Sequence, residues 1–149
     1  MQISISEIIA KAAGFKKKEE KIEWLKKNSS EPLRTILKLT YDTDNIKFLL
    51  PDSTPPWKKN DYIDVQGMLY KEARRLKLFV KGFGYDDLDQ VKREQLFITL
   101  LEDIDNDDAE LLCKMIKQKP IKGLPLDVVV SAFPEDYPTI KNQENKTHG

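Results

Sequence analysis

Three aspartates in the middle of the chain have the spacing of a calcium-binding loop. Asp103, Asp105 and Asp107 match its first, third and fifth positions, where carboxylates coordinate the ion. The sixth position requires Gly but holds Asp108, and the twelfth requires a bidentate Glu but holds Lys114. We therefore expect no metal site here. The acidic side chains are better explained as caps and charges that favour the start of a following helix.

Other residue types with catalytic chemistry are scarce. The only histidine, His148, lies in a polar C-terminal stretch, which excludes a histidine triad or a multi-histidine zinc site in the fold. Gly82-Phe83-Gly84 lacks the remaining residues of a phosphate-binding loop. The only cysteine, Cys113, falls on an apolar helix face and is expected to be a buried structural thiol. A catalytic carboxylate pair is compatible with the composition, although no two acidic residues stand out. We expect a protein that is not an enzyme and needs no cofactor.

A basic segment holds the strongest binding candidates. Its cations recur at three-residue and four-residue spacing, with an aromatic side chain beside them: Tyr70, Lys71, Arg74, Arg75, Lys77 and Lys81. Such a stripe can hold phosphate groups while the aromatic ring stacks on a base. Alternatively, it can pair with the acidic stretch from Asp86 to Glu110, which follows after a short turn. Pairing within the fold is the interpretation that we favour.

A second binding candidate is Trp57, which follows two prolines in the segment Pro51 to Asn60. This segment cannot continue a helix, so an extended Pro-rich loop is expected. The Pro-Pro-Trp run is either a recognition element or a loop anchored to the protein body by its indole ring. Anchoring is the more common arrangement.

Periodic apolar residues predict that the segments around these candidates are helical. Helices are expected over residues 4–14, 17–27, 30–41, 65–81, 89–104, 105–119 and 126–133. Ser4 and Ser30 are expected caps. Residues 46–50 fit a strand or a helix, and Val128-Val129-Val130 argues weakly for a strand in the last segment. The predicted fold is all-α, a compact bundle of about six or seven short helices with one extended Pro-rich loop.

Length and composition favour one soluble domain. The 149 residues can bury a core without disulfides or metals, so we expect a single helical domain over residues 1–140 and a disordered polar tail over 141–149. Equal numbers of basic and acidic residues, 25 each, give no global field to attract nucleic acid or membrane. A single cysteine suits a reducing compartment, and neither a signal peptide nor a membrane-spanning segment is expected.

Several short motifs carry a family signal through their joint order along nearly the whole chain. They are Pro32-Leu33-Arg34-Thr35-Ile36-Leu37, Leu50-Pro51, Leu69-Tyr70-Lys71-Glu72, Lys92-Arg93-Glu94-Gln95-Leu96-Phe97-Ile98, Asp107-Asp108-Ala109-Glu110-Leu111-Leu112, Lys122-Gly123-Leu124 and Ala132-Phe133-Pro134. In these motifs the chain resembles a family of small uncharacterised proteins from T4-like tailed bacteriophages. Phe83 departs from the Gly-Gly-rich turn expected at its position. The family has no assigned activity, so the resemblance implies no functional residue. It implies a viral protein that acts in the bacterial host cytoplasm or in the particle.

The leading functional hypothesis is a non-enzymatic phage protein that binds a host or phage protein. Its expected contacts are Trp57 and the face from Lys71 to Lys81, because aromatics and arginines dominate interface energetics. The first alternative is a nucleic-acid-binding accessory protein that uses the basic helix. The second is a minor structural component of the virion. No membrane partner is expected, and the sequence leaves the oligomeric state open.

Overall fold

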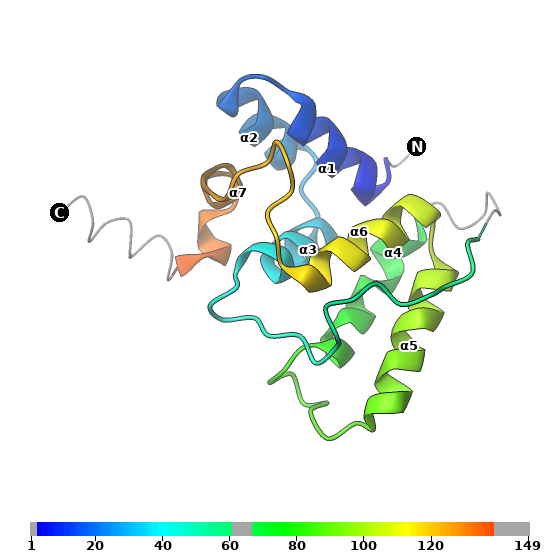
Figure 1. Ribbon diagram of the computed structural model, residues 1–149. Helices are drawn as coiled ribbons and strands as arrows, with labels where there is room; N and C mark the ends of the chain where they lie inside the picture. Colours follow the sequence, from blue (N-terminus) through cyan, green and yellow to red (C-terminus); the bar gives the residue numbers. More distant parts are fainter. Residues whose placement is uncertain (1–2, 61–66, 139–149) are drawn as a thin grey trace.

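The helices form a bundle around one apolar core, as the computed structural model shows for residues 3–60 and 67–138 (Figure 1). Its α-helices are α1 (Ile5–Gly14), α2 (Lys18–Lys27), α3 (Glu31–Tyr41), α4 (Met68–Glu72), α5 (Gln90–Asp103), α6 (Asn106–Lys117) and α7 (Leu126–Ala132). Two short 3₁₀ segments accompany them in this part of the chain: η2 (Ala73–Phe79) and η3 (Pro134–Asp136). No β-strand occurs among these residues, so the predicted all-α class is confirmed.

Side-chain caps begin the helices where the sequence predicts them. The Ser4 hydroxyl accepts from the backbone N–H of Glu7 at 3.3 Å, and the Ser30 hydroxyl accepts from that of Leu33 at 3.2 Å. Each bond satisfies an N–H group that has no partner within its helix. At the acidic hinge, the Asp105 carboxylate accepts from the backbone N–H of Asp107 at 3.2 Å, and α6 begins there. The predicted function of the hinge as a helix start is confirmed.

Helices α5 and α6 bury the faces that their periodicity predicts. The buried residues are Phe97, Leu100, Leu101 and Ile104 at the first helix, and Ala109, Leu112, Cys113 and Ile116 on the second. Helix α6 packs against α3 as well as α5, and α1 also contacts it. Helix α6 is therefore the central element, with α5 on one side and α1 on another (Figure 1).

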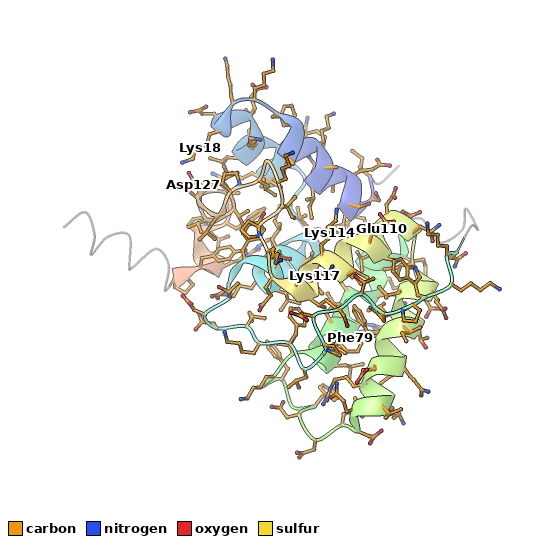
Figure 2. All side chains as sticks on the ribbon, viewed as in Figure 1. Lys18, Phe79, Glu110, Lys114, Lys117 and Asp127 are labelled. Carbon is orange, nitrogen blue, oxygen red and sulfur yellow. The ribbon has the colours of Figure 1, made fainter. Side chains whose placement is uncertain are left out.

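Helices α1, α2 and α7 form a second group at the other end of the bundle (Figure 1). The buried Lys21 of α2 donates from Nζ to the carbonyl oxygens of Ala13, at 2.9 Å, and Gly123, at 2.6 Å. It therefore satisfies the C-terminal end of α1 and holds the loop before α7 in place. An exposed ion pair adds to the group: Lys18 Nζ lies 2.8 Å from Asp127 Oδ2, with the two side chains facing each other (Figure 2).

The predicted helix over residues 65–81 is wrong in its geometry. The chain forms one α-helical turn in α4 and then the 3₁₀ segment η2, while residues 61–66 lie outside the described part. Leu76 and Phe79 are buried at three-residue spacing, which a helix of three residues per turn places on one edge. Packing of this edge against the core explains why the segment tightens.

Two ambiguous segments are resolved by the structure. Residues 46–50 form neither a helix nor a named strand; Phe48 makes an isolated antiparallel bridge with Val80. The valine run at residues 128–130 is helical and fully within α7, so the weak strand signal is overruled. Packing of three buried valines against the core outweighs their β-propensity.

The remaining predictions about organisation have different outcomes. Residues 51–60 carry neither helix nor strand, whereas their description as an extended Pro-rich loop stays a prediction, as does the single domain over residues 1–140. The predicted tail, residues 141–149, and His148 within it lie outside the described residues. Across those described residues, none of the helices has the length and apolar character needed to cross a membrane.

Candidate binding groove

A groove of about 560 Å³ opens between α3 and the α4–η2 segment, which lie side by side. Its lining combines apolar and cationic side chains: Glu31, Pro32, Thr35, Lys38, Leu39, Ile46, Tyr70, Lys71, Ala73, Arg74, Leu76, Lys77, Val80 and Phe83. The volume falls within the range of roughly 300–1,000 Å³ that is typical of ligand-binding clefts. Two other hollows, of about 260 Å³ each, fall below this range. We therefore take the larger groove as the candidate site.

The floor of the groove is apolar. Leu39 comes from α3, Ile46 from the turn after it, and Leu76 from η2; all three are buried in the core. Val80 continues this floor, and Pro32 borders it at the start of α3. Because the floor side chains are fixed by core packing, the groove is preformed.

The 3₁₀ geometry of η2 aligns three cations along one rim. Residues three apart lie on the same edge of a 3₁₀ helix, so Arg74 and Lys77 follow each other there, and Lys71 of α4 precedes them. All three side chains are exposed. Among the described residues, none of the three has an ion-pair partner within 4.0 Å. This row therefore presents positive charge to whatever enters the groove.

Arg75 points to the other side of the same segment. Its Nε lies 2.6 Å from Glu72 Oε2, outside hydrogen-bond geometry, and its Nη1 donates to Asp103 Oδ2 of α5 at 3.1 Å. Pairing between the basic segment and the acidic stretch therefore occurs, but it involves this arginine and leaves the groove row uncovered. Because the Arg75 side chain is 39% exposed, we assign the pair little stability.

The opposite wall contributes one paired cation and one acid. Lys38 of α3 lies 2.5 Å from Asp42 Oδ2 and also donates to the carbonyl oxygen of Asp136. Its charge is therefore largely used within the fold. Glu31 is exposed at the start of α3 and is the only acidic side chain among the described residues that line the groove. The described part of the groove lining is consequently positive on balance.

The structure separates the remaining predicted site residues. Tyr70 lines the groove, half-buried, but its hydroxyl donates to the carbonyl oxygen of Ile3, and burial raises its pKa. Lys81 is exposed beyond η2 and does not line the groove. Trp57 is half-buried, packs against the core and is likewise not part of the lining. Four of the seven predicted residues thus share one site, namely Tyr70, Lys71, Arg74 and Lys77.

Sequence reasoning did not include the apolar floor or Phe83 in the site. Leu39 and Ile46 look like ordinary core residues in the sequence, and only tertiary packing brings them beside η2. Phe83 carried a detectable signal, because a large aromatic side chain between two glycines is poorly explained by core packing. It is 52% exposed in the structure.

Two other reactive groups, Cys113 and Asp108, are buried and are not among the residues that line the groove. Cys113 is 4% exposed, as predicted, and burial raises the pKa of its thiol to about 11. Asp108 is fully buried; one carboxylate oxygen accepts from the backbone N–H of Ser6 at 3.0 Å, and desolvation raises its pKa. Within the part of the chain that the structure describes, no group of three or more potential metal ligands occurs.

Comparison with known proteins identifies a family but no characterised relative. The model of a family of unknown function, DUF6433, matches residues 8–122, a range that includes the whole groove. No curated protein and no solved structure matches this chain.

Proposed function

The chain belongs to the DUF6433 family of unknown function, and for this member we propose a non-enzymatic role in which the groove binds a short segment of a partner protein. The observation that carries the proposal is the combination of a preformed apolar floor with an exposed cationic rim. This combination favours an amphipathic segment whose apolar side chains enter the groove while its carboxylates face the rim.

The apolar floor supports the binding energy that the proposal requires. Leu39, Leu76 and Val80 are among the apolar residues that line the groove, and we propose that leucine or phenylalanine side chains of a partner pack against this lining. Burying one such side chain contributes on the order of 1.5–3 kcal/mol before ordering costs. Two or three of them therefore suffice for a reversible interaction.

The rim supports the specificity of the proposal. Lys71, Arg74 and Lys77 have no carboxylate partner among the described residues, so an acidic partner gains charge interactions without breaking an ion pair of these residues. Charged groups at the edge of an interface mainly accelerate association and reject like-charged competitors. We therefore expect acidic segments to bind and basic segments of equal hydrophobicity to be rejected.

The resemblance to proteins of T4-like phages supports a viral origin. On this basis we propose that the partner is a host or phage protein and that the two meet in the cytoplasm of the infected bacterium. The neutral net charge and the local concentration of charge at the groove suit a protein that recognises one surface selectively.

Affinity capture from infected cells, with nuclease treatment, tests this function. Wild-type bait should retain a stoichiometric protein that Arg74→Glu/Lys77→Glu bait loses. Lys17→Glu/Lys26→Glu bait, with an equal charge change at the exposed N-cap of α2 and an exposed position within it, should retain the protein. The captured protein should then bind in purified form through an acidic, apolar segment. Turnover of a substrate by the chain, or equal capture by all three baits, would contradict the proposal.

The exposed cationic row also favours a second candidate function, binding of nucleic acid. Three phosphate contacts from Lys71, Arg74 and Lys77 predict an affinity that falls about tenfold for a single strand and about twentyfold for duplex DNA over a threefold rise in salt. Fluorescence anisotropy with labelled DNA and RNA measures this dependence directly. Binding that is absent for both nucleic acids eliminates this candidate and leaves the protein-binding groove intact.

A further inference from the structure

The three most exposed large hydrophobic side chains of the described residues all lie in one short stretch. Phe83 is 52% exposed, Tyr85 is 37% exposed and Val91 is 66% exposed. They belong to the turn that connects η2 to α5 and to the first residues of α5; we call residues 82–91 the tip. Isolated exposed hydrophobic side chains are common, but three of them within ten residues indicate a contact surface.

A buried arginine fixes the shape of the tip. Arg93 of α5 donates from Nη2 to the carbonyl oxygens of Tyr85, at 2.7 Å, and Asp86, at 3.2 Å. Its Nε donates to the carbonyl oxygen of Leu78 at 3.3 Å, which ties the tip to η2. Because the hydrogen bonds of Arg93 fix the backbone of the tip, binding a partner through the exposed aromatic rings costs little additional conformational entropy.

The tip is also acidic. Asp86, Asp87 and Asp89 are exposed there; Asp86 accepts from the backbone N–H of Gly82, and Asp89 caps α5. The Asp87 carboxylate has no hydrogen bond or ion pair among the described residues. The tip therefore has the apolar and acidic character that the groove requires of its occupant.

Groove and tip are contiguous in the fold. Phe83 belongs to the tip and also lines the groove, and Lys77 of the groove rim lies 5.9 Å from the centre of the Tyr85 ring. With a twofold axis beside Phe83, the tip of each copy can reach the groove of the other. Such an arrangement is a closed dimer, because the groove and the tip of one copy are both covered by the tip and the groove of the other.

We propose that the occupant of the groove in the free protein is the acidic aromatic tip of a second copy of this chain, so that a symmetric dimer covers both grooves. Charge complementarity between rim and tip favours this pairing, and the zero net charge of the chain removes long-range repulsion between copies. A partner protein then competes with the tip for the same surface. This inference rests on the proposed function, because it names what regulates access to the groove.

Charge reversal across the two surfaces provides a specific test by analytical ultracentrifugation of the full chain. Wild type should form dimers whose dissociation constant rises at least about tenfold in Arg74→Glu and in Asp87→Lys, since each reversal places like charges together twice. The double variant Arg74→Glu/Asp87→Lys should restore the homodimer. A mixture of the two single variants should form a heterodimer. Lys26→Glu, an exposed change on α2, should leave the dimer unchanged.

The alternative outcomes are distinguishable. Circular dichroism first establishes that each variant is folded. We expect all of them to fold, because Arg74 and Asp87 are exposed. A wild-type monomer that still binds an acidic amphipathic peptide overturns the dimer but not the groove. A dimer that none of the reversals weakens, or that the double variant fails to restore, overturns the tip-to-groove pairing. A monomer that does not bind the peptide contradicts both proposals.

Discussion

Cys113 illustrates how the position of a side chain on its helix decides its chemistry. It lies on the buried face of α6 between α5 and α3, and desolvation is the main cause of its high pKa, about 11. Lys117 lowers that pKa and Glu110 raises it, but both effects are smaller. The thiolate, which is the reactive form, is therefore rare at neutral pH.

Cys113 should resist alkylation in the native protein. We predict that iodoacetamide modifies it at least about a hundredfold more slowly than a free thiol near neutral pH, because burial limits both access and ionisation. Mass spectrometry with and without denaturant measures the difference. The rate should rise steeply with pH below about 11. Native alkylation at the rate of the denatured chain would contradict the burial of this side chain.

Gly123 should be irreplaceable for two reasons. Its φ is +85°, and an added Cβ would lie 2.5 Å from the carbonyl oxygen of Ala13. We predict that Gly123→Ala lowers the free energy of unfolding by about 2–4 kcal/mol. Gly67→Ala is the matched control, since Gly67 has φ +83° with nothing within 4 Å and should cost about 1 kcal/mol. Equal losses in urea denaturation would remove the close approach as the cause.

Asp108 should give the protein a measurable dependence of stability on pH. Burial raises its folded-state pKa above the ordinary value of 3.8, so the folded state binds the proton more tightly than the unfolded state. The free energy of unfolding therefore decreases as pH rises from about 3.8, the ordinary pKa, through the higher pKa of Asp108 in the folded state. We predict that Asp108→Asn becomes progressively more stable relative to wild type over this window. Urea denaturation at several pH values measures the trend, and a difference that stays constant would contradict it.

At the scale of elements, buried polar contacts join neighbouring helices and also segments that lie far apart in the sequence. Lys21 links α2 to the end of α1 and to the loop before α7 through carbonyl oxygens. A charged donor to buried carbonyl groups is difficult to replace, because its loss leaves acceptors without partners.

Replacing Lys21 with an apolar residue of similar length tests this link. We predict that Lys21→Met lowers the free energy of unfolding by about 2–3 kcal/mol, with the largest increase of amide hydrogen exchange in α1 and α7. Lys17→Met is the control, because Lys17 is exposed and its side chain has no hydrogen bond or ion pair among the described residues. Similar losses in the two variants would show that the Lys21 bonds do not stabilise this end of the bundle.

The elements also mark the limit of prediction from sequence. Serine caps and apolar periodicity predicted α1, α3, α5 and α6 because those signals are local. For residues 73–79 the sequence predicts an α-helix, whereas the structure has a 3₁₀ helix. The sequence fits both types. Leu76 and Phe79 have the spacing of three residues per turn, and Leu76 and Val80 have the spacing of an α-helix. Burial of Phe79, which decides between them, depends on the distant α5.

The candidate site likewise has one part that the sequence predicts and another that depends on tertiary packing. Its cationic row was predictable, because Lys71, Arg74 and Lys77 are close in sequence and of one charge. Its floor was not predictable, because α3 lies more than thirty residues earlier and only the packing of the whole bundle brings it beside η2. The side of η2 that Arg75 occupies likewise depends on Asp103 of α5.

At the scale of the whole molecule, zero net charge conceals strong local segregation. The groove rim is basic and the tip is acidic, and both adjoin exposed or accessible apolar surface at one end of the bundle. A protein with this distribution is suited to docking on a complementary surface, whether that surface belongs to a partner or to a second copy.

The central claim, that the groove binds an acidic apolar segment, is tested most directly by NMR titration of the ¹⁵N-labelled chain. The ligand is a synthetic amphipathic helix with leucines on one face and glutamates on the other, and the control peptide carries lysines in place of the glutamates. We predict shifts concentrated at the amides of Thr35, Leu39, Arg74 and Lys77, lost in Arg74→Glu/Lys77→Glu and absent with the control peptide. Shifts that cluster on another surface, or equal responses to both peptides, would contradict the claim.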